Sequence, residues 1–455
     1  MKFAGSIVST LRHWFGDGVF RRIFKNAGYM LSGRAATGLL SLATLTLCAR
    51  TLGVEQFGIL VLVQTFGQVT ATLATFQSPQ TMIRYGAMAL QREDTPAFQS
   101  LVKLLTAIDA VGGVFAVCVG FVIAPLVGPH VGWSPEVIGY AQLYSFLVFF
   151  TACATPTGVL RLLDRFDLLA IQTTMTPLLR LIGISTAVLL HAPFWGYLLA
   201  WFFAQMAGGT TLTILAWREM YKKQRLVGMT FSFAGLQDSH WGVLRFLLQS
   251  NLYSALLILT GHISTFLIGY LAGPASAGLY KLGRDVATVL TKPADLLNQS
   301  VSPEFARLAS RDAWGEFSRL ILRGASVAAG AGGIMVLVVI TVGDLFLHTF
   351  FGEAFAGAYV PLVVLVAAAG VSIIGFPMDA ALFAMGRANL PLRVSMSVIF
   401  VVQLPLLVVL ARSYGSAGAG FAVLAAAATT LVTMSLLTFH QLRQRTALVP
   451  DAVAA

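Results

Sequence analysis

The chain has 455 residues, of which 57% are hydrophobic and only 11% are charged, and its mean hydropathy is +0.80. This composition excludes an ordinary soluble domain and indicates a protein that crosses a membrane several times. The net charge of +11 does not imply nucleic-acid binding, because most basic residues lie in short segments beside apolar stretches, where they orient a membrane protein and attract anionic lipid headgroups.

The N-terminal residues 1–27 precede the first long apolar stretch. Aromatic positions such as Phe15 and Phe20 alternate there with Arg21 and Arg22, which is typical of a helix lying on the inner surface of a membrane. The segment lacks the pattern of a cleavable signal peptide, so we expect a cytoplasmic amphipathic anchor.

Twelve apolar windows follow, each long enough for a helix that crosses a hydrocarbon core of about 30 Å. They cover residues 28–49, 56–76, 101–124, 138–159, 168–190, 194–217, 246–271, 277–301, 325–347, 358–382, 390–411 and 417–439. Twenty of the thirty Lys and Arg residues lie on the side of the N-terminus, whereas only Arg50 and Arg412 lie between spans on the other side. The positive-inside rule therefore predicts that both termini and the longer loops are cytoplasmic.

An internal repeat is visible in the turns between spans, because Gly273 and Gly278 repeat the spacing of Gly53 and Gly58 after a shift of 220 residues. We predict an all-α polytopic membrane protein whose twelve helices form two pseudo-symmetric six-helix bundles around a central cavity, with the site near the midplane. The expected parts are a cytoplasmic amphipathic segment at 1–27, an N-terminal six-helix half at 28–217, a cytoplasmic linker at 218–240, a C-terminal six-helix half at 241–439 and a cytoplasmic tail at 440–455.

Polar stripes follow one face of the second span and one face of the eighth. They consist of Gln64, Gln68, Thr72 and Thr75 in the second span, and of Lys281, Arg284, Asp285, Thr288, Lys292, Asp295 and Gln299 in the eighth. A charge in hydrocarbon costs about 2.5–3.5 kcal/mol on insertion scales, so the charged stripe must face protein or water. An alternative is that Lys281 pairs with Asp285, and Lys292 with Asp295, at helical spacing.

Two further cations lie inside predicted spans. Arg34 is only two turns into the first span, which is close enough for it to snorkel to the surface. Arg180 lies about 18 Å from the start of the fifth span, which favours a role in a cavity. The acids Asp109 and Asp379 also lie within or at the ends of spans, and either pairing with cations or protonation is open to them.

The interior charges are mainly cationic, and a desolvated cationic cavity selects an anion. Arginine binds phosphate oxygens bidentately and keeps its charge, so the pattern indicates an alternating-access carrier for a phosphorylated amphiphile. The predicted substrate-binding residues are Arg34, Arg180, Lys281, Arg284, Lys292, Gln64 and Gln68, and the candidates for coupling to protons or sodium are Asp109, Asp285, Asp295 and Asp379. The cysteines Cys48, Cys118 and Cys153 all lie in apolar spans, so we predict no disulfide, metal site or cofactor.

Four segments carry a resemblance to a known family: Ala49–Gly58, Leu160–Phe166, Leu271–Tyr280 and Phe351–Phe355. They resemble the polysaccharide-transport branch of the multidrug/oligosaccharidyl-lipid/polysaccharide (MOP) exporter superfamily. The resemblance implies an O-antigen-type flippase of the bacterial inner membrane, which moves an undecaprenyl-diphosphate-linked oligosaccharide, an O-antigen or exopolysaccharide repeat unit, from the cytoplasmic to the periplasmic leaflet. It implies no particular site residues, and it leaves open whether a polysaccharide polymerase complex is a partner.

Three other functions stay open. A cation-coupled multidrug exporter of the same superfamily would use acids such as Asp285 and Asp295 to bind cationic drugs. A membrane-embedded glycan polymerase or ligase would need a sizeable periplasmic loop, whereas the longest outer segment, about 125–137, has Glu136 as its one charged residue. A non-transporting scaffold, in which buried charges only pair with one another, would tolerate the joint neutralisation of a Lys and an Asp.

Overall fold

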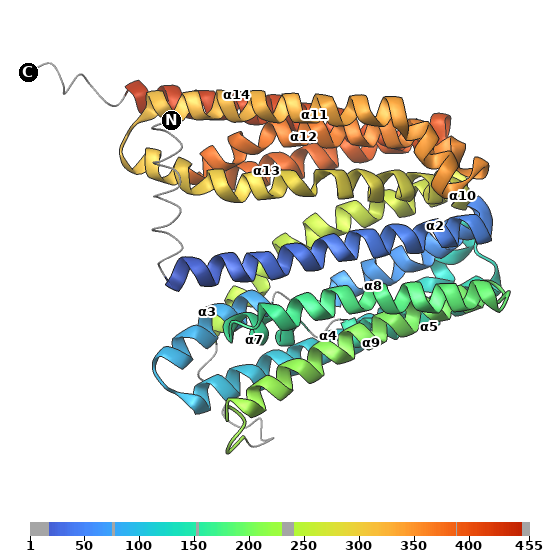
Figure 1. The fold of residues 1–455 in the computed structure, drawn as a ribbon, viewed down its shortest axis with the longest axis horizontal. Coiled ribbons are helices and arrows are strands. Elements are labelled where there is room, and N and C mark those ends of the chain that lie inside the picture. The colour runs from blue at the N-terminus through green and yellow to red at the C-terminus, as the bar shows by residue number, and fades with distance from the viewer. Residues whose placement is uncertain (1–17, 75–77, 152–153, 230–240, 388, 448–455) are drawn as a thin grey trace, which may run out of the picture. The chain divides into compact units, whose positions relative to one another are not determined.

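The structure is a computed structural model that describes residues 18–74, 78–151, 154–229, 241–387 and 389–447 (Figure 1). Its elements are α2 (Gly18–Ala74), α3 (Ser78–Gln91), α4 (Thr95–Val127), η1 (Gly128–Val131), α5 (Pro135–Ser145), α6 (Leu147–Thr151), α7 (Thr155–Leu162), α8 (Phe166–Leu189), α9 (Phe194–Lys222), α10 (Trp241–Ser310), α11 (Trp314–Phe351), η2 (Glu353–Ala358), α12 (Tyr359–Ala384), α13 (Asn389–Val398), η3 (Ile399–Gln403) and α14 (Leu404–Ala447). Every element in these ranges is helical, which confirms the all-α prediction.

Three of the helices bend between two predicted spans, at a glycine with positive φ; α2 and α10 hold both spans, whereas the window at 390–411 begins in α13 and ends in α14. Helix α2 bends at Gly53 (φ 70°, ψ 176°), α10 at Gly273 (φ 82°, ψ 169°) and α14 at Gly415 (φ 56°, ψ −132°). Glycine adopts such angles readily because it lacks a Cβ atom. The angles at Gly53 and Gly273 are nearly the same, as the predicted repeat requires.

Eight segments within the described residues are long and apolar enough to cross a membrane. Two of them, Ala36–Thr72 and Asn389–Arg445, each overlap two predicted windows, and the windows at 246–271 and 277–301 lie in α10. The fourth window, at 138–159, is interrupted and forms α5, α6 and α7. Pro156 in the first turn of α7 is one physical reason, because proline lacks the backbone N–H that a continuing helix uses and is favoured in the first turn of a new helix.

The chain divides into two compact units. The first comprises Met1–Leu47, Phe66–Leu126 and Pro135–Leu259, and the second comprises Cys48–Thr65, Val127–Ser134 and Thr260–Ala455. Helix α2 therefore contributes residues on both sides of its kink to the second unit. The core of the first unit includes the buried side chains of Met82, Phe98, Leu105, Leu160 and Met220. The core of the second includes Phe305, Phe317, Ile321, Leu382 and Met434.

Within the second unit, the segment after the α2 kink packs closely on the α10 kink. A Cβ atom on Gly58 would overlap the carbonyl group of Pro274, and a Cβ atom on Gly278 would lie 3.0 Å from the Cα atom of Gly58. The two glycines of the predicted repeat therefore allow the backbones of α2 and α10 to touch, which side chains at these positions would prevent.

We expect the Gly58→Ala variant to be less stable by about 1–3 kcal/mol, because the added methyl group meets backbone rather than a movable side chain. Thermal unfolding of the purified protein in detergent measures this change. Gly315→Ala in α11 is the matched control, because a Cβ atom there has no neighbour within 4 Å. Equal unfolding temperatures for the two variants would contradict the close packing at Gly58.

Candidate substrate-binding site

In the second unit, the kink at Gly273 turns α10 back on itself, so that Arg284 reaches the preceding arm of the same helix. Its Nη1 atom donates a hydrogen bond to the carbonyl oxygen of Gly261. The guanidinium group lies where a side chain at position 261 would begin, because a Cβ atom there would be 3.2 Å from Cζ and would overlap Nη2. The half-buried Arg284 forms no ion pair with a carboxylate of the described residues.

On the same helix, Lys281 and Asp285, which flank Arg284 in the sequence, form an ion pair. The Lys281 Nζ atom lies 2.5 Å from a carboxylate oxygen of Asp285, and the two side chains are 20% and 31% exposed. This is the pairing at helical spacing that the sequence left open, and it neutralises both charges. Arg284 therefore carries the net charge of this part of α10.

His262 is a polar neighbour of this cluster that the sequence reasoning missed. Its half-buried ring interacts electrostatically with Arg284, Lys281 and Asp285. A usable signal was present, since His262 and Arg284 lie eleven residues before and after Gly273. Residues equally distant from a hairpin kink lie at similar heights in its two arms, so the position of the kink limits which residues can meet.

The polar stripe of the second span is divided between the two units. Gln64 belongs to the second unit, is half-buried, and its Nε2 atom has no hydrogen-bond partner among the described residues. Gln68 belongs to the first unit and is exposed, and its carbonyl oxygen accepts a hydrogen bond of 2.8 Å from Thr72 Oγ1. The buried Nε2 group of Gln64 can therefore donate a hydrogen bond to a ligand or to water.

In the first unit, Arg180 projects from the middle of α8 onto α9. Its Cζ atom lies 4.4 Å from the ring centroid of Trp201, and Nη2 donates to the amide oxygen of Gln205 at 3.2 Å. The indole face and the amide attract the cation without cancelling its charge. Arg180 is thus a half-buried cation in a membrane-spanning helix, in contact with an indole ring and an amide.

Asp109 is almost completely buried in α4, with 1% of its surface exposed. It accepts hydrogen bonds from Ser78 Oγ at 2.6 Å, from the Thr155 backbone N–H at 2.8 Å and from Thr155 Oγ1 at 2.7 Å. These bonds join α4 to α3 and α7. The carboxylate also lines a small cavity of about 30 Å³ together with Thr106 and Thr213.

Among the other predicted acids, Asp379 in α12 is half-buried, and its side chain has no ion pair with another described residue. The side chains of Arg34, Lys292 and Asp295 lie outside the described part of the structure, so their predicted roles stay predictions. No group of three or more His, Cys, Asp or Glu side chains within the described residues is arranged to hold a metal ion.

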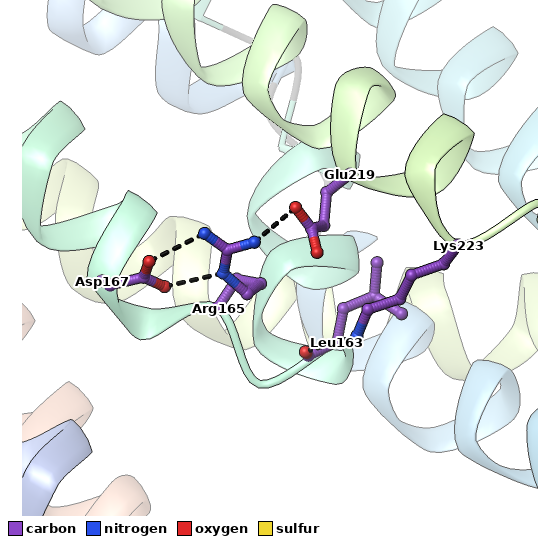
Figure 2. Close-up of polar contacts among 5 residues, drawn as sticks. All are labelled: Leu163, Arg165, Asp167, Glu219 and Lys223. Carbon is purple, nitrogen blue, oxygen red and sulfur yellow. Dashed lines mark hydrogen bonds and ion pairs between the residues drawn. The ribbon is translucent and has the colours of Figure 1, made fainter.

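Arg165 connects the turn between α7 and α8 to the end of α9 (Figure 2). Its Nε and Nη2 atoms donate hydrogen bonds of 2.9 and 2.8 Å to the carboxylate of Asp167. Its Nη1 atom donates a hydrogen bond to the buried carboxylate of Glu219. The hydrogen bonds to Asp167 are the main cause that raises the pKa of Arg165. Lys223 adds a bond of 3.2 Å to the carbonyl oxygen of Leu163. Arg165, one of the basic residues from which the membrane orientation is predicted, is therefore also part of an ion-pair network.

Comparisons with known proteins agree with this architecture. The family described as "Polysaccharide biosynthesis protein" matches residues 23–309. The inner membrane protein YghQ of Escherichia coli (strain K12) is 31% identical over 353 residues, which cover 77% of this chain and 98% of that protein.

Two solved structures define the fold. An inward-facing multidrug resistance MATE family transporter of the MOP superfamily is similar with a TM-score of 0.68 and 12% identity, over 93% of this chain and 96% of the other. A mutant of the MATE transporter VcmN of Vibrio cholerae has a TM-score of 0.54 and 17% identity, over 93% of this chain and 97% of the other. The chain therefore belongs to the polysaccharide biosynthesis protein family and has the fold of the MOP superfamily transporters.

Proposed function

We propose that this protein is a flippase of the bacterial inner membrane, which moves an undecaprenyl-diphosphate-linked oligosaccharide from the cytoplasmic to the periplasmic leaflet. The observation that carries the proposal is the presence of half-buried arginines in membrane-spanning helices. Arg284 donates a hydrogen bond to the backbone of Gly261, and Arg180 contacts the ring of Trp201 and the amide of Gln205. Family membership supports a transporter rather than an enzyme.

The chemistry of such a substrate matches these residues. A diphosphate carries negative charge on oxygens that accept paired hydrogen bonds from a guanidinium group, and arginine cannot lose its proton in the membrane. The sugars need polar partners, which amides such as Gln64 and Gln205 supply. The polyprenyl chain is apolar and can stay in lipid, so only the head of the substrate has to cross within the protein.

The proposed transport cycle uses the two sequence halves, residues 28–217 and 241–439, which alternate between opening to the cytoplasm and to the periplasm. Both termini are proposed to be cytoplasmic, on the basis of the distribution of Lys and Arg between spans. We also propose that transport is coupled to protons or sodium. Asp109 and Asp379 are the candidate coupling residues within the described part of the structure. The Asp285 carboxylate is paired with Lys281, which makes it the weaker candidate.

Transfer of a sugar-labelled, undecaprenyl-diphosphate-linked oligosaccharide in vesicles containing the purified protein tests this function. We expect protein-dependent exposure of the sugar to a membrane-impermeant glycosidase on the far side, because the flippase moves the head group across. Vesicles without protein are the control. Uptake of a cationic dye without glycan transfer would support the multidrug exporter instead, and a lengthened glycan would support a polymerase.

A further inference from the structure

We propose that Gly261 is the positioning residue for Arg284, so that the absence of a side chain at position 261 determines where the diphosphate-binding guanidinium group lies. The inference rests on the proposed function and deepens it, since it names the residue that sets the geometry of the anion site in the second unit. Gly261 itself contacts no substrate atom in this proposal, and it acts only through Arg284.

The contact geometry supports a specific fit between the glycine and the guanidinium group. A Cβ atom on Gly261 would lie 3.2 Å from Cζ, 3.4 Å from Nη1 and in overlap with Nη2 of Arg284. Nη2 thus occupies the space that an alanine methyl group would fill, Cζ lies in tight contact with that space, and Nη1 lies at ordinary contact distance. The carbonyl oxygen of the same glycine accepts the hydrogen bond from Nη1, so Gly261 both admits the group and orients it.

The displaced group at this position would be the end of a flexible side chain. An added methyl group therefore moves the guanidinium group and leaves the backbone of α10 in place, unlike a methyl group on Gly58, which meets the backbone of Pro274. The Gly261→Ala variant should consequently fold normally and yet hold Arg284 in the wrong place. Bidentate binding of a phosphate by the planar guanidinium group is sensitive to such a displacement, because both N–H groups must face the phosphate oxygens together.

The contact between Gly261 and Arg284 forms because α10 is bent into a hairpin. Gly261 precedes the kink at Gly273 and Arg284 follows it, so the hydrogen bond joins two predicted spans. Among the described residues Arg284 forms no ion pair, whereas nearby Lys281 is neutralised by Asp285. The position of this one guanidinium group therefore determines where the net positive charge of the cluster is presented.

A double-mutant cycle between positions 261 and 284 tests the proposal, with binding of undecaprenyl diphosphate to the purified protein as the readout. We expect Gly261→Ala to weaken binding about tenfold when Arg284 is present, and to have no further effect in the Arg284→Ala background, because one charge-assisted contact is removed in both cases. An equal loss in both backgrounds, or no loss in either, would overturn the positioning role.

Gly269→Ala is the matched control on the same arm of α10. A Cβ atom there would displace the flexible side chain of Leu62, whose Cδ2 atom would be 2.6 Å away, so the steric change is similar but no cation moves. We expect binding within about twofold of the unmodified protein for this variant. A loss as large as that of Gly261→Ala would show that any crowding of this arm impairs binding, and would also overturn the proposal.

The rate of modification of Arg284 by phenylglyoxal, followed by peptide mass spectrometry, separates this inference from the proposed function. A guanidinium group released from Gly261 should react several-fold faster in Gly261→Ala than in the unmodified protein or in Gly269→Ala. If the reactivity changes but Arg284→Ala still transports the oligosaccharide normally, the proposed role of Arg284 fails while the positioning holds. If the reactivity does not change, the positioning fails.

Discussion

The Arg284→Ala variant is expected to transfer the diphosphate-linked oligosaccharide about 10- to 150-fold more slowly than the unmodified protein, because a charge-assisted contact contributes about 1.5–3 kcal/mol. Arg284→Lys should retain an intermediate rate, since lysine keeps the charge but cannot donate two parallel hydrogen bonds. Transfer in vesicles that contain equal amounts of folded protein measures both variants.

Arg323→Ala in α11 is the matched control for this experiment. Arg323 is exposed on the second unit and is not part of the proposed site, so its removal changes the net charge of the protein equally but should leave transfer unchanged. If Arg323→Ala reduced transfer as much as Arg284→Ala, the effect would reflect total charge rather than a specific contact with the substrate.

The Glu219→Gln variant is expected to lower the free energy of unfolding by about 2 kcal/mol, because it removes a buried carboxylate from the Arg165 guanidinium group. The value is smaller than for a fully isolated pair, since Arg165 keeps both hydrogen bonds to Asp167 and is 29% exposed. Thermal unfolding in detergent, together with the yield of monodisperse protein, measures the loss.

Glu304→Gln is the matched control, because it breaks another Arg–Glu pair at the surface. The side chains of Arg307 and Glu304 are 58% and 40% exposed, and such a pair contributes less than about 1 kcal/mol. Unfolding at the same temperature for Glu219→Gln and Glu304→Gln would show that the network in Figure 2 does not stabilise the first unit.

The helices were predictable from the sequence because local composition is sufficient to define them. Each spanning segment must satisfy its own backbone hydrogen bonds in lipid, so apolar length alone indicates a helix. The kinks at Gly53 and Gly273 were indicated by the spacing of the glycines, and the structure places a positive φ at both. The break within the fourth window was missed, although Pro156 was a signal for it.

The candidate site was predictable only in part. The structure places Arg180 and Arg284 as half-buried cations within helices, but it pairs Lys281 with Asp285. Their spacing along one helix is compatible both with an ion pair and with separate roles in binding substrate or a coupling ion, so the spacing could not distinguish these alternatives. His262 and Gly261 were missed because neither belongs to the polar stripe of the eighth span.

The residue pattern is enough to specify an all-α membrane protein with polar stripes and cations within its spans, because the requirements of lipid act on each segment separately. The group that each cation contacts became visible only in the folded protein. Arg284 lies on Gly261, and Arg165 reaches Glu219 across 54 positions of the chain. Such contacts depend on how helices turn back and pack, and no local pattern of residues specifies a partner that is distant in sequence.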